Sequence, residues 1–297
     1  MKLSVILAVQ EGAHRLEAVV GALSADLPDG VEVLVAWPRD DGAAARVVNA
    51  HGDLDWLVPL QGGSGALVPE LWALGIRTAR SPRVALTVVH CVPPPGWVQR
   101  LIDADLETWA GLGGPIDQRP GSDSLGWAIY LQRYTPFASV ASPHGVEEVG
   151  DIAADNALYD RAALNDVADS WAEGFWEPTV HAALRARGRR LACDPTLVLL
   201  HDNGYSAVGF IRQRLHHGFR FGRDRARAMP PMLGAAYAAA TPTVPLLFGR
   251  KVLTRALRLR EARPHLPGAL PWLAVFVGAW ALGEVLGAQS GAFGGDR

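Results

Sequence analysis

The segment between residues 84 and 97, VALTVVHCVPPPGW, constrains the fold more than any other part of this chain. Its first five residues, 84–88, form an apolar and partly β-branched run. This run predicts a strand buried on both faces, because an exposed strand would alternate polar and apolar side chains. The three prolines at 93–95 cannot donate hydrogen bonds to a sheet, so the chain must leave the sheet close to His90. His90 is therefore predicted at the carboxyl end of a strand, where ligands collect in an open α/β sheet.

Strands and helices alternate before this segment. Residues 3–9 and 31–36 read as short buried strands with apolar residues at helical spacing between them, and a third short strand is expected at 56–60. A helix is expected over residues 68–79. Alternation of this kind predicts an α/β fold with a mostly parallel sheet flanked by helices, and a crevice lined by the loops after residues 9, 36 and 88. The 297 residues, 49% of them hydrophobic, are ample for a core.

The pattern is less regular after residue 97. We expect a helix directly after Trp97, a further strand over residues 127–134, and a helix that begins near Pro178 and ends at Gly188. Residues 191–201 return as an extended segment that ends at His201.

Charge and cysteine content limit the classes of function. The net charge is −2, so the chain as a whole is not basic and no nucleic-acid partner is predicted. Cys91 and Cys193 are too few for a disulfide framework or a cysteine-only zinc site, which fits a reducing compartment. The apolar residues 3–9 lack a small-residue cleavage site, so they favour a first strand over a signal peptide. We therefore expect the amino-terminal part in the cytosol.

The carboxyl-terminal third predicts contact with a membrane. Eighteen uncharged residues separate His265 from Glu284, enough for one transmembrane helix. Residues 228–249 are also uncharged, but their prolines and Arg-rich flanks favour a surface or re-entrant arrangement. Residues 250–263 place apolar side chains together on one helical face with Arg side chains around them. This arrangement is expected for a helix that lies in the headgroup region of a membrane. The alternative is a globular helical subdomain. We expect the chain to consist of three parts, residues 1–205, 206–263 and 264–297. The chain is expected to be membrane-associated, with the first part on the cytoplasmic side.

Four segments carry a resemblance to a known family. They are, in chain order, SVILAVQEG, VALTVVHCVPPPGW, DNALYDR and GFWEPTVHAALRARG. Together they resemble the family 2 glycosyltransferases of the GT-A type over about residues 1–220. The resemblance implies a nucleotide-diphospho-sugar transferase-like fold, a nucleotide-diphosphate sugar as donor, and a hydroxyl acceptor. With the apolar tail, the acceptor is expected to be lipid-linked or a glycan near the membrane.

The resemblance also implies roles for individual residues. Glu177 stands at the position of the catalytic base, and Asp155 and Asn156 stand in the loop that faces the acceptor. The matching glutamine and arginine near the diphosphate are Gln213 and Arg214. The donor or its nucleotide is expected at Val9, Glu11, Trp37, Gly65 and Val88.

The two carboxylates of the family's DxD motif are replaced here by Val88 and His90. An imidazole can replace a carboxylate as a ligand, particularly for Mn, so His90 and His201 are predicted to bind a divalent ion, Mn or Mg, together with the diphosphate. Glu177 as base implies direct displacement with inversion at the anomeric carbon.

Each of these residues has a simpler reading. The histidines could be structural at strand ends, Glu177 could stabilise a helix amino terminus, and Asp155 with Asn156 could form a turn. The alternative function is a catalytically degenerate GT-A domain that serves as a membrane-bound binding or scaffold subunit. An unrelated α/β binding protein is a third reading, and it would require Glu177 to lie far from His90.

Overall fold

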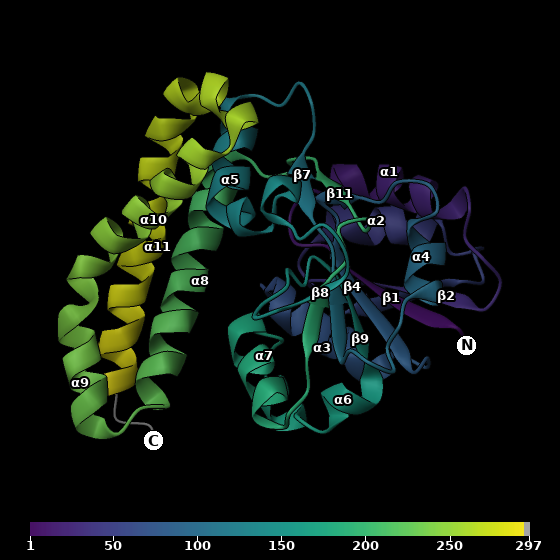
Figure 1. Ribbon diagram of the computed structural model, residues 1–297, viewed down its shortest axis with the longest axis horizontal. Helices are drawn as coiled ribbons and strands as arrows, with labels where there is room; N and C mark the ends of the chain where they lie inside the picture. The colour runs from purple at the N-terminus through teal and green to yellow at the C-terminus, as the bar shows by residue number, and fades with distance from the viewer. Residues whose placement is uncertain (294–297) are drawn as a thin grey trace. The chain divides into compact units, whose positions relative to one another are not determined.

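The computed structural model describes residues 1–293, and it shows an α/β chain (Figure 1). The chain divides into two compact units. The first, the sheet unit, consists of residues 1–119 and 137–204. The second, the helical unit, consists of residues 120–136 and the chain from residue 205 onward. Residues 294–297, at the end of the predicted membrane segment, lie outside the described part.

The sheet unit is built on an eight-stranded sheet with the order β3-β2-β1-β4-β9-β6-β10-β8. Strands β1 to β4 are parallel to one another, whereas β9 is antiparallel to both of its neighbours and β8 is antiparallel to β10. The mostly parallel sheet flanked by helices confirms the predicted fold class. Its strands are β1 Leu3–Ala8, β2 Val31–Trp37, β3 Leu57–Gln61, β4 Arg83–Val88, β6 Gly111–Gly113, β8 Glu147–Val149, β9 Asn156–Asp160 and β10 Leu191–Cys193.

A second, three-stranded sheet lies at the end of β4. Its order is β5-β11-β7, and β11 is antiparallel to β5 and parallel to β7. The expected extended segment 191–201 is thus two short strands, one in each sheet. The three strands are β5 Cys91–Val92, β7 Ile116–Gln118 and β11 Leu199–His201.

The helices of the sheet unit follow local signals in the sequence. Helix α1 buries the side chains that repeat at helical spacing, and Asp41 caps α2 by accepting hydrogen bonds from two backbone N–H groups. Glu70 accepts from the backbone N–H of Leu67, and Pro69 lies in the first turn of α3. These helices are α1 Ala13–Ser24, α2 Gly42–Ala50, α3 Val68–Thr78, α4 Trp97–Asp103, α6 Arg161–Asn165 and α7 Glu177–Ala186.

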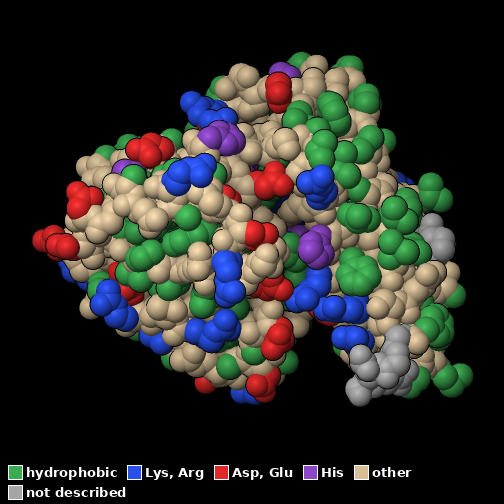
Figure 2. All heavy atoms as spheres, turned by 180° about the vertical axis from the view of Figure 1, so that it is seen from behind, with side chains coloured by type: hydrophobic (Ala, Val, Ile, Leu, Met, Phe, Trp, Pro, Cys, Tyr) green, Lys and Arg blue, Asp and Glu red, His purple; other side chains and the backbone are tan. Residues whose placement is uncertain are grey.

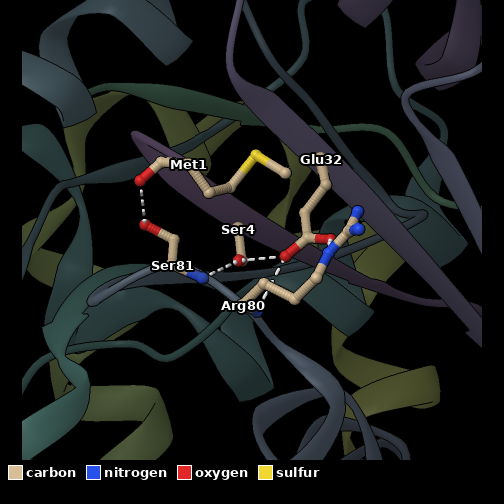
Figure 3. A network of polar contacts seen from close by, with 5 residues as sticks. All are labelled: Met1, Ser4, Glu32, Arg80 and Ser81. Atoms are coloured by element: carbon tan, nitrogen blue, oxygen red, sulfur yellow. Dashed lines mark hydrogen bonds and ion pairs between the residues drawn. The ribbon is translucent and has the colours of Figure 1, made fainter.

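A buried carboxylate joins β1, β2 and the loop before β4 at the edge opposite to His90 (Figure 3). Glu32 is 1% exposed. Its carboxylate accepts hydrogen bonds from the Ser4 hydroxyl at 2.6 Å, the Arg80 backbone N–H at 2.8 Å and the Arg80 Nε–H at 2.7 Å. The Ser81 backbone N–H donates to the Ser4 hydroxyl oxygen at 3.0 Å. Burial acts to raise the pKa of Glu32, but the hydrogen bonds from Ser4 and Arg80 outweigh it and lower that pKa.

The predicted strand over residues 127–134 is wrong, because this segment forms helix α5, Ser124–Arg133. The side chain of Asp123 accepts a hydrogen bond from the Gly126 backbone N–H at 2.7 Å, so it caps the helix. An apolar run of this length fits a buried helix as well as a buried strand. Helix α5 belongs to the helical unit with α8 Ala207–Arg227, α9 Pro231–Ala240, α10 Val244–Arg258 and α11 Leu266–Phe293.

Helices α8 and α11 pack with their backbones in contact. Glycines repeat every fourth residue on the facing sides of the two helices. A Cβ atom added at Gly222 of α8 would overlap the carbonyl oxygen of Glu284, and one added at Gly287 of α11 would overlap the carbonyl oxygen of Phe219. Glycine is therefore required along this contact, because any side chain would force the helices apart.

Part of the surface of the helical unit is apolar. The segment from Arg260 to Phe293 is long and apolar enough to cross a membrane: an 18-residue window within it has a mean hydropathy of 1.7, and 39% of that window is buried. A core helix of a soluble protein can meet the same criterion. Figure 2 shows hydrophobic side chains gathered on the surface. Large exposed ones on this unit include Met232, Leu233, Leu246, Leu247, Leu257, Leu282 and Leu286.

Candidate functional site

His90 follows β4 at the carboxyl edge of the sheet, as the proline run after it predicts. Its side chain is buried, and its Nε2–H donates to the backbone carbonyl oxygen of Gln10 at 3.2 Å. A Cβ atom added at Gly12 would lie 2.6 Å from the imidazole Cε1, and one added at Gly204 would lie 2.7 Å from Nδ1. The ring therefore lies between two loops that approach it only because both positions are glycine.

His201 belongs to the same set of contacts. It is the last residue of β11, where it is paired in register with Cys91 of β5. Its side chain is fully buried, and its Nδ1–H donates to the amide oxygen of Gln118 at 2.7 Å. The backbone N–H of the next residue, Asp202, donates to the carbonyl oxygen of His90 at 2.8 Å. The two histidines predicted as metal ligands are thus linked through the backbone, by the pairing of His201 with Cys91 and by the hydrogen bond from Asp202 to His90.

Asp202 brings two arginines to this edge. Its Oδ2 accepts a hydrogen bond from Arg15 at 2.7 Å and a second from Arg119. Arg15 also donates to the backbone carbonyl oxygen of Asn203 at 3.2 Å. No local pattern in the sequence predicts this cluster, since Arg15 and Asp202 lie 187 positions apart. The one available signal was an acidic residue directly after the strand that ends at His201.

Glu177 begins α7 and lies against the start of β9. Its Oε1 accepts a hydrogen bond from the backbone N–H of Ala154 at 2.7 Å. Strand β9 begins where β4 ends, since Asn156 is paired with Thr87 in the register of these two strands (Figure 1). Ala154 lies two residues before Asn156, and His90 lies three residues after Thr87. Glu177 and His90 are therefore attached to neighbouring strands at the same edge of the sheet.

A buried polar chain lies behind Glu177 on the same face of α7. His181, four residues further along the helix, is fully buried, and its Nδ1–H donates to Asp151 at 3.1 Å while its Nε2 accepts from the Tyr159 hydroxyl at 2.8 Å. The hydrogen bond from His181 lowers the pKa of Asp151. Burial, together with the negative charges of Glu177, Asp151 and Asp155, raises the pKa of Tyr159 well above its usual value. These contacts fix the side of α7 from which Glu177 projects.

Asn156, predicted to face the acceptor, holds two loops and the start of α4 together. Its side chain is 1% exposed. Its amide N–H groups donate to the carbonyl oxygens of Pro115 at 2.9 Å and Leu197 at 2.5 Å, and its oxygen accepts from the Trp97 indole at 3.1 Å. Asp155 beside it is 6% exposed. The structure shows a structural role for Asn156, and acceptor contact by this pair stays a prediction.

The residues predicted to contact the donor share one location. Each lies at or just after the carboxyl end of one of the parallel strands β1 to β4, so the fold brings them to one edge. Glu11 adopts a positive φ of 55°, and the Gly65 backbone N–H donates to Asp40 at 2.8 Å. The five residues are Val9 and Glu11 after β1, Trp37 at the end of β2, Gly65 after β3 and Val88 at the end of β4.

Gln213 and Arg214 lie on α8 in the helical unit. Arg214 Nε–H donates to the Gln213 amide oxygen at 2.6 Å, and the guanidinium lies 4.9 Å from the ring centre of Phe210. Their contact with a diphosphate stays a prediction.

The donor set at the sheet edge does not fit a resident divalent ion. Mn and Mg favour oxygen ligands, and within residues 1–293 no group of three or more His, Cys, Asp or Glu side chains is placed to hold a metal. The hydrogen bonds of His90 and His201 to Gln10 and Gln118 each use only one ring nitrogen, as in metal-bound histidines, so the poor fit rests on the shortage of oxygen ligands. The carboxylate of Asp202 already accepts from two guanidinium groups.

No family model matches the chain, and no curated protein sequence matches it. Among solved structures, it is similar to the mannosyltransferase PcManGT from Pyrobaculum calidifontis in complex with GDP-Man and Mn2+. The TM-score is 0.53 and the identity 18%, over 95% of this chain and 86% of that one. It is also similar to S. aureus TarS 1-349 in complex with UDP-GlcNAc, with a TM-score of 0.52 and 12% identity over 94% and 91% of the two chains. These likenesses show that the chain has a glycosyltransferase-type α/β fold.

Proposed function

We propose that this chain is a glycosyltransferase that moves a sugar from a nucleotide-diphosphate sugar to a hydroxyl group, and that it is related to the family 2 enzymes of the GT-A type. The structures that it resembles carry GDP-Man or UDP-GlcNAc. The observation that carries the proposal is the placement of Glu177 and the loop after β4 on neighbouring strands at one edge. That edge also holds the five residues predicted to contact the donor.

Glu177 is the proposed base of the reaction. One carboxylate oxygen is held by the Ala154 backbone N–H, which fixes the orientation of the group at the amino terminus of α7. The carboxylate takes the proton of the acceptor hydroxyl while the hydroxyl oxygen attacks the anomeric carbon. The bond from that carbon to the diphosphate oxygen breaks, and its electron pair leaves with the nucleoside diphosphate. Direct displacement of this kind inverts the anomeric carbon.

The substitution Glu177→Gln tests this assignment, because it keeps the shape and one acceptor oxygen but cannot take a proton. We expect release of nucleoside diphosphate from UDP- and GDP-sugars to fall by about 10²- to 10⁴-fold, the usual contribution of a general base, with donor affinity unchanged. Glu173→Gln, an exposed glutamate four residues earlier, is the matched control. Unchanged turnover in Glu177→Gln would remove this residue as the base.

The second candidate function is a binding or scaffold subunit with a degenerate GT-A domain. It is favoured by Val88 and His90, which stand at the positions of the DxD carboxylates, and by the burial of both side chains. Calorimetry with nucleoside diphosphates and Mn or Mg separates the two functions, because absence of nucleotide binding would favour the scaffold subunit.

We also propose that the helical unit binds a membrane, with the sheet unit on the cytoplasmic side. One helix is long and apolar enough to cross a bilayer, and large apolar side chains are exposed on α9, α10 and α11. Twelve Arg and Lys residues occur between positions 212 and 263 against two acidic residues, a bias that favours anionic lipid headgroups. The acceptor would then be lipid-linked or a glycan near the membrane.

A further inference from the structure

Two arginines at the carboxyl edge of the sheet share a single acidic partner. Arg15 and Arg119 both donate to the same carboxylate oxygen of Asp202. The side chain of Asp202 is 11% exposed, whereas those of Arg15 and Arg119 are 32% and 55% exposed. The carboxylate is thus covered while both guanidinium groups reach the surface.

The position of this pair matches the place where the proposed donor binds. Arg15 lies in the first turn of α1, directly after the loop that follows β1 and carries Val9 and Glu11. Asp202 is joined to the loop after β4 by the hydrogen bond from its N–H to the His90 carbonyl oxygen. Strands β1 and β4 are neighbours in the sheet. In open α/β sheets, ligands bind outside the carboxyl ends of such strands.

Unsatisfied donors lie beside the charged groups. Within residues 1–293, Arg15 Nε–H and the Gln118 side-chain N–H₂ are buried without a hydrogen-bond partner. Gln118 is 9% exposed, it directly precedes Arg119, and its amide oxygen is held by His201. Buried donors are normally paired, since each unpaired group carries a desolvation cost. Unpaired donors at an edge that carries two arginines indicate a ligand that is anionic and rich in acceptor oxygens.

We infer that Arg15 and Arg119 bind the diphosphate of the nucleotide sugar and supply, in place of a divalent ion, the positive charge that its departure requires. This inference rests on the proposed function. As the bond to the anomeric carbon breaks, the electron pair stays on the diphosphate oxygen, and the two fixed guanidinium groups stabilise that charge. Guanidinium groups suit this task because their planar N–H groups match the geometry of phosphate oxygens. The poor fit of the local donor set to a metal agrees with this assignment.

Calorimetric titration of the full chain with UDP and GDP, in EDTA and again with Mn, tests the inference. We expect nucleoside diphosphate to bind in EDTA with an affinity that Mn does not change, and Arg15→Gln and Arg119→Gln each to weaken binding by about tenfold or more, the scale of one lost charge-assisted hydrogen bond. Arg15→Lys should retain part of the affinity. Arg46→Gln, an exposed arginine on α2, makes the same charge change as a control and should bind as the unmodified chain does.

The outcomes separate the inference from the proposed function. Binding that requires Mn, or binding that neither Arg15→Gln nor Arg119→Gln changes, overturns the role of the arginines but leaves a sugar transferase in place. Absence of binding both in EDTA and with Mn, for UDP and for GDP, overturns both proposals. If Arg15→Gln fails to fold because Asp202 loses its partner, Arg119→Gln carries the test, since its more exposed side chain contributes less to stability.

Discussion

Replacing Glu32 gives a prediction about stability whose size follows from the structure. The carboxylate is 1% exposed and accepts three hydrogen bonds, one from Ser4 and two from Arg80 (Figure 3). Glu32→Ala leaves the Ser4 hydroxyl and the Arg80 backbone N–H without their acceptor. Each hydrogen bond to a charged group contributes about 1.5–3 kcal/mol, so loss of the hydrogen bonds from the Ser4 hydroxyl and the Arg80 backbone N–H should cost about 3–6 kcal/mol.

Substitution of the arginine should cost much less. The Arg80 side chain is 62% exposed, and ion pairs with an exposed partner contribute about 0–1 kcal/mol. Arg80→Ala also keeps its backbone N–H, and with it the hydrogen bond to Glu32. We therefore expect urea unfolding at pH 7 to show a large loss of unfolding free energy for Glu32→Ala, a smaller loss for Glu32→Gln, and at most about 1 kcal/mol for Arg80→Ala. Glu107→Gln, an exposed glutamate, is the control.

The carboxylate of Glu32 should also make the free energy of unfolding depend on pH. The pKa of Glu32 in the folded chain lies below its usual value of 4.5, because the hydrogen bonds outweigh the effect of burial. A lowered pKa means that this stabilisation is fully present above about pH 4.5 and is lost as the pH falls through the folded-state value. The difference in unfolding free energy between the unmodified chain and Glu32→Gln should therefore shrink in acid. Equal stability of the two at pH 7, with the same response to acid, would refute the reasoning.

The remaining predictions concern the helical unit. Gly287→Ala should destabilise it by about 1–3 kcal/mol in thermal unfolding, because the added methyl group overlaps the facing backbone of α8. Gly278→Ala on the same helix meets nothing within 4 Å and should be neutral or slightly stabilising; equal losses for both would show that α8 and α11 do not pack closely. The full chain should float with anionic lipid vesicles more than with neutral ones, and Leu246→Asp with Leu247→Asp should reduce this, whereas Val140→Asp, an exposed apolar residue of the sheet unit, should not. Flotation unaffected by the paired substitutions would remove α10 from the membrane contact.

Local signals in the sequence account for most of the sheet and for its functional edge. The proline run after Val92 places His90 at a strand end, because proline cannot donate to a sheet wherever the strand lies. The helical spacing in residues 13–24 and the start of the helix at Glu177 are likewise properties of neighbouring residues. Residues 127–134 show where such signals fail. Their apolar run fits a strand or a helix, and the capping side chain of Asp123 lies outside the run itself.

The role of each polar residue at the edge depends on partners that are far away in the chain. Asn156 looks like a turn residue in its own segment, yet its amide holds the start of α4 at Trp97 and the loops that contain Pro115 and Leu197. The pairing of Arg15 with Asp202 follows from the approach of two loops around His90, which Gly12 and Gly204 permit. Which strands end at this edge is thus readable from the chain, because strand ends follow from neighbouring residues. Which charges meet there is a property of the folded molecule, because pairing over 187 positions depends on how the sheet brings distant loops together.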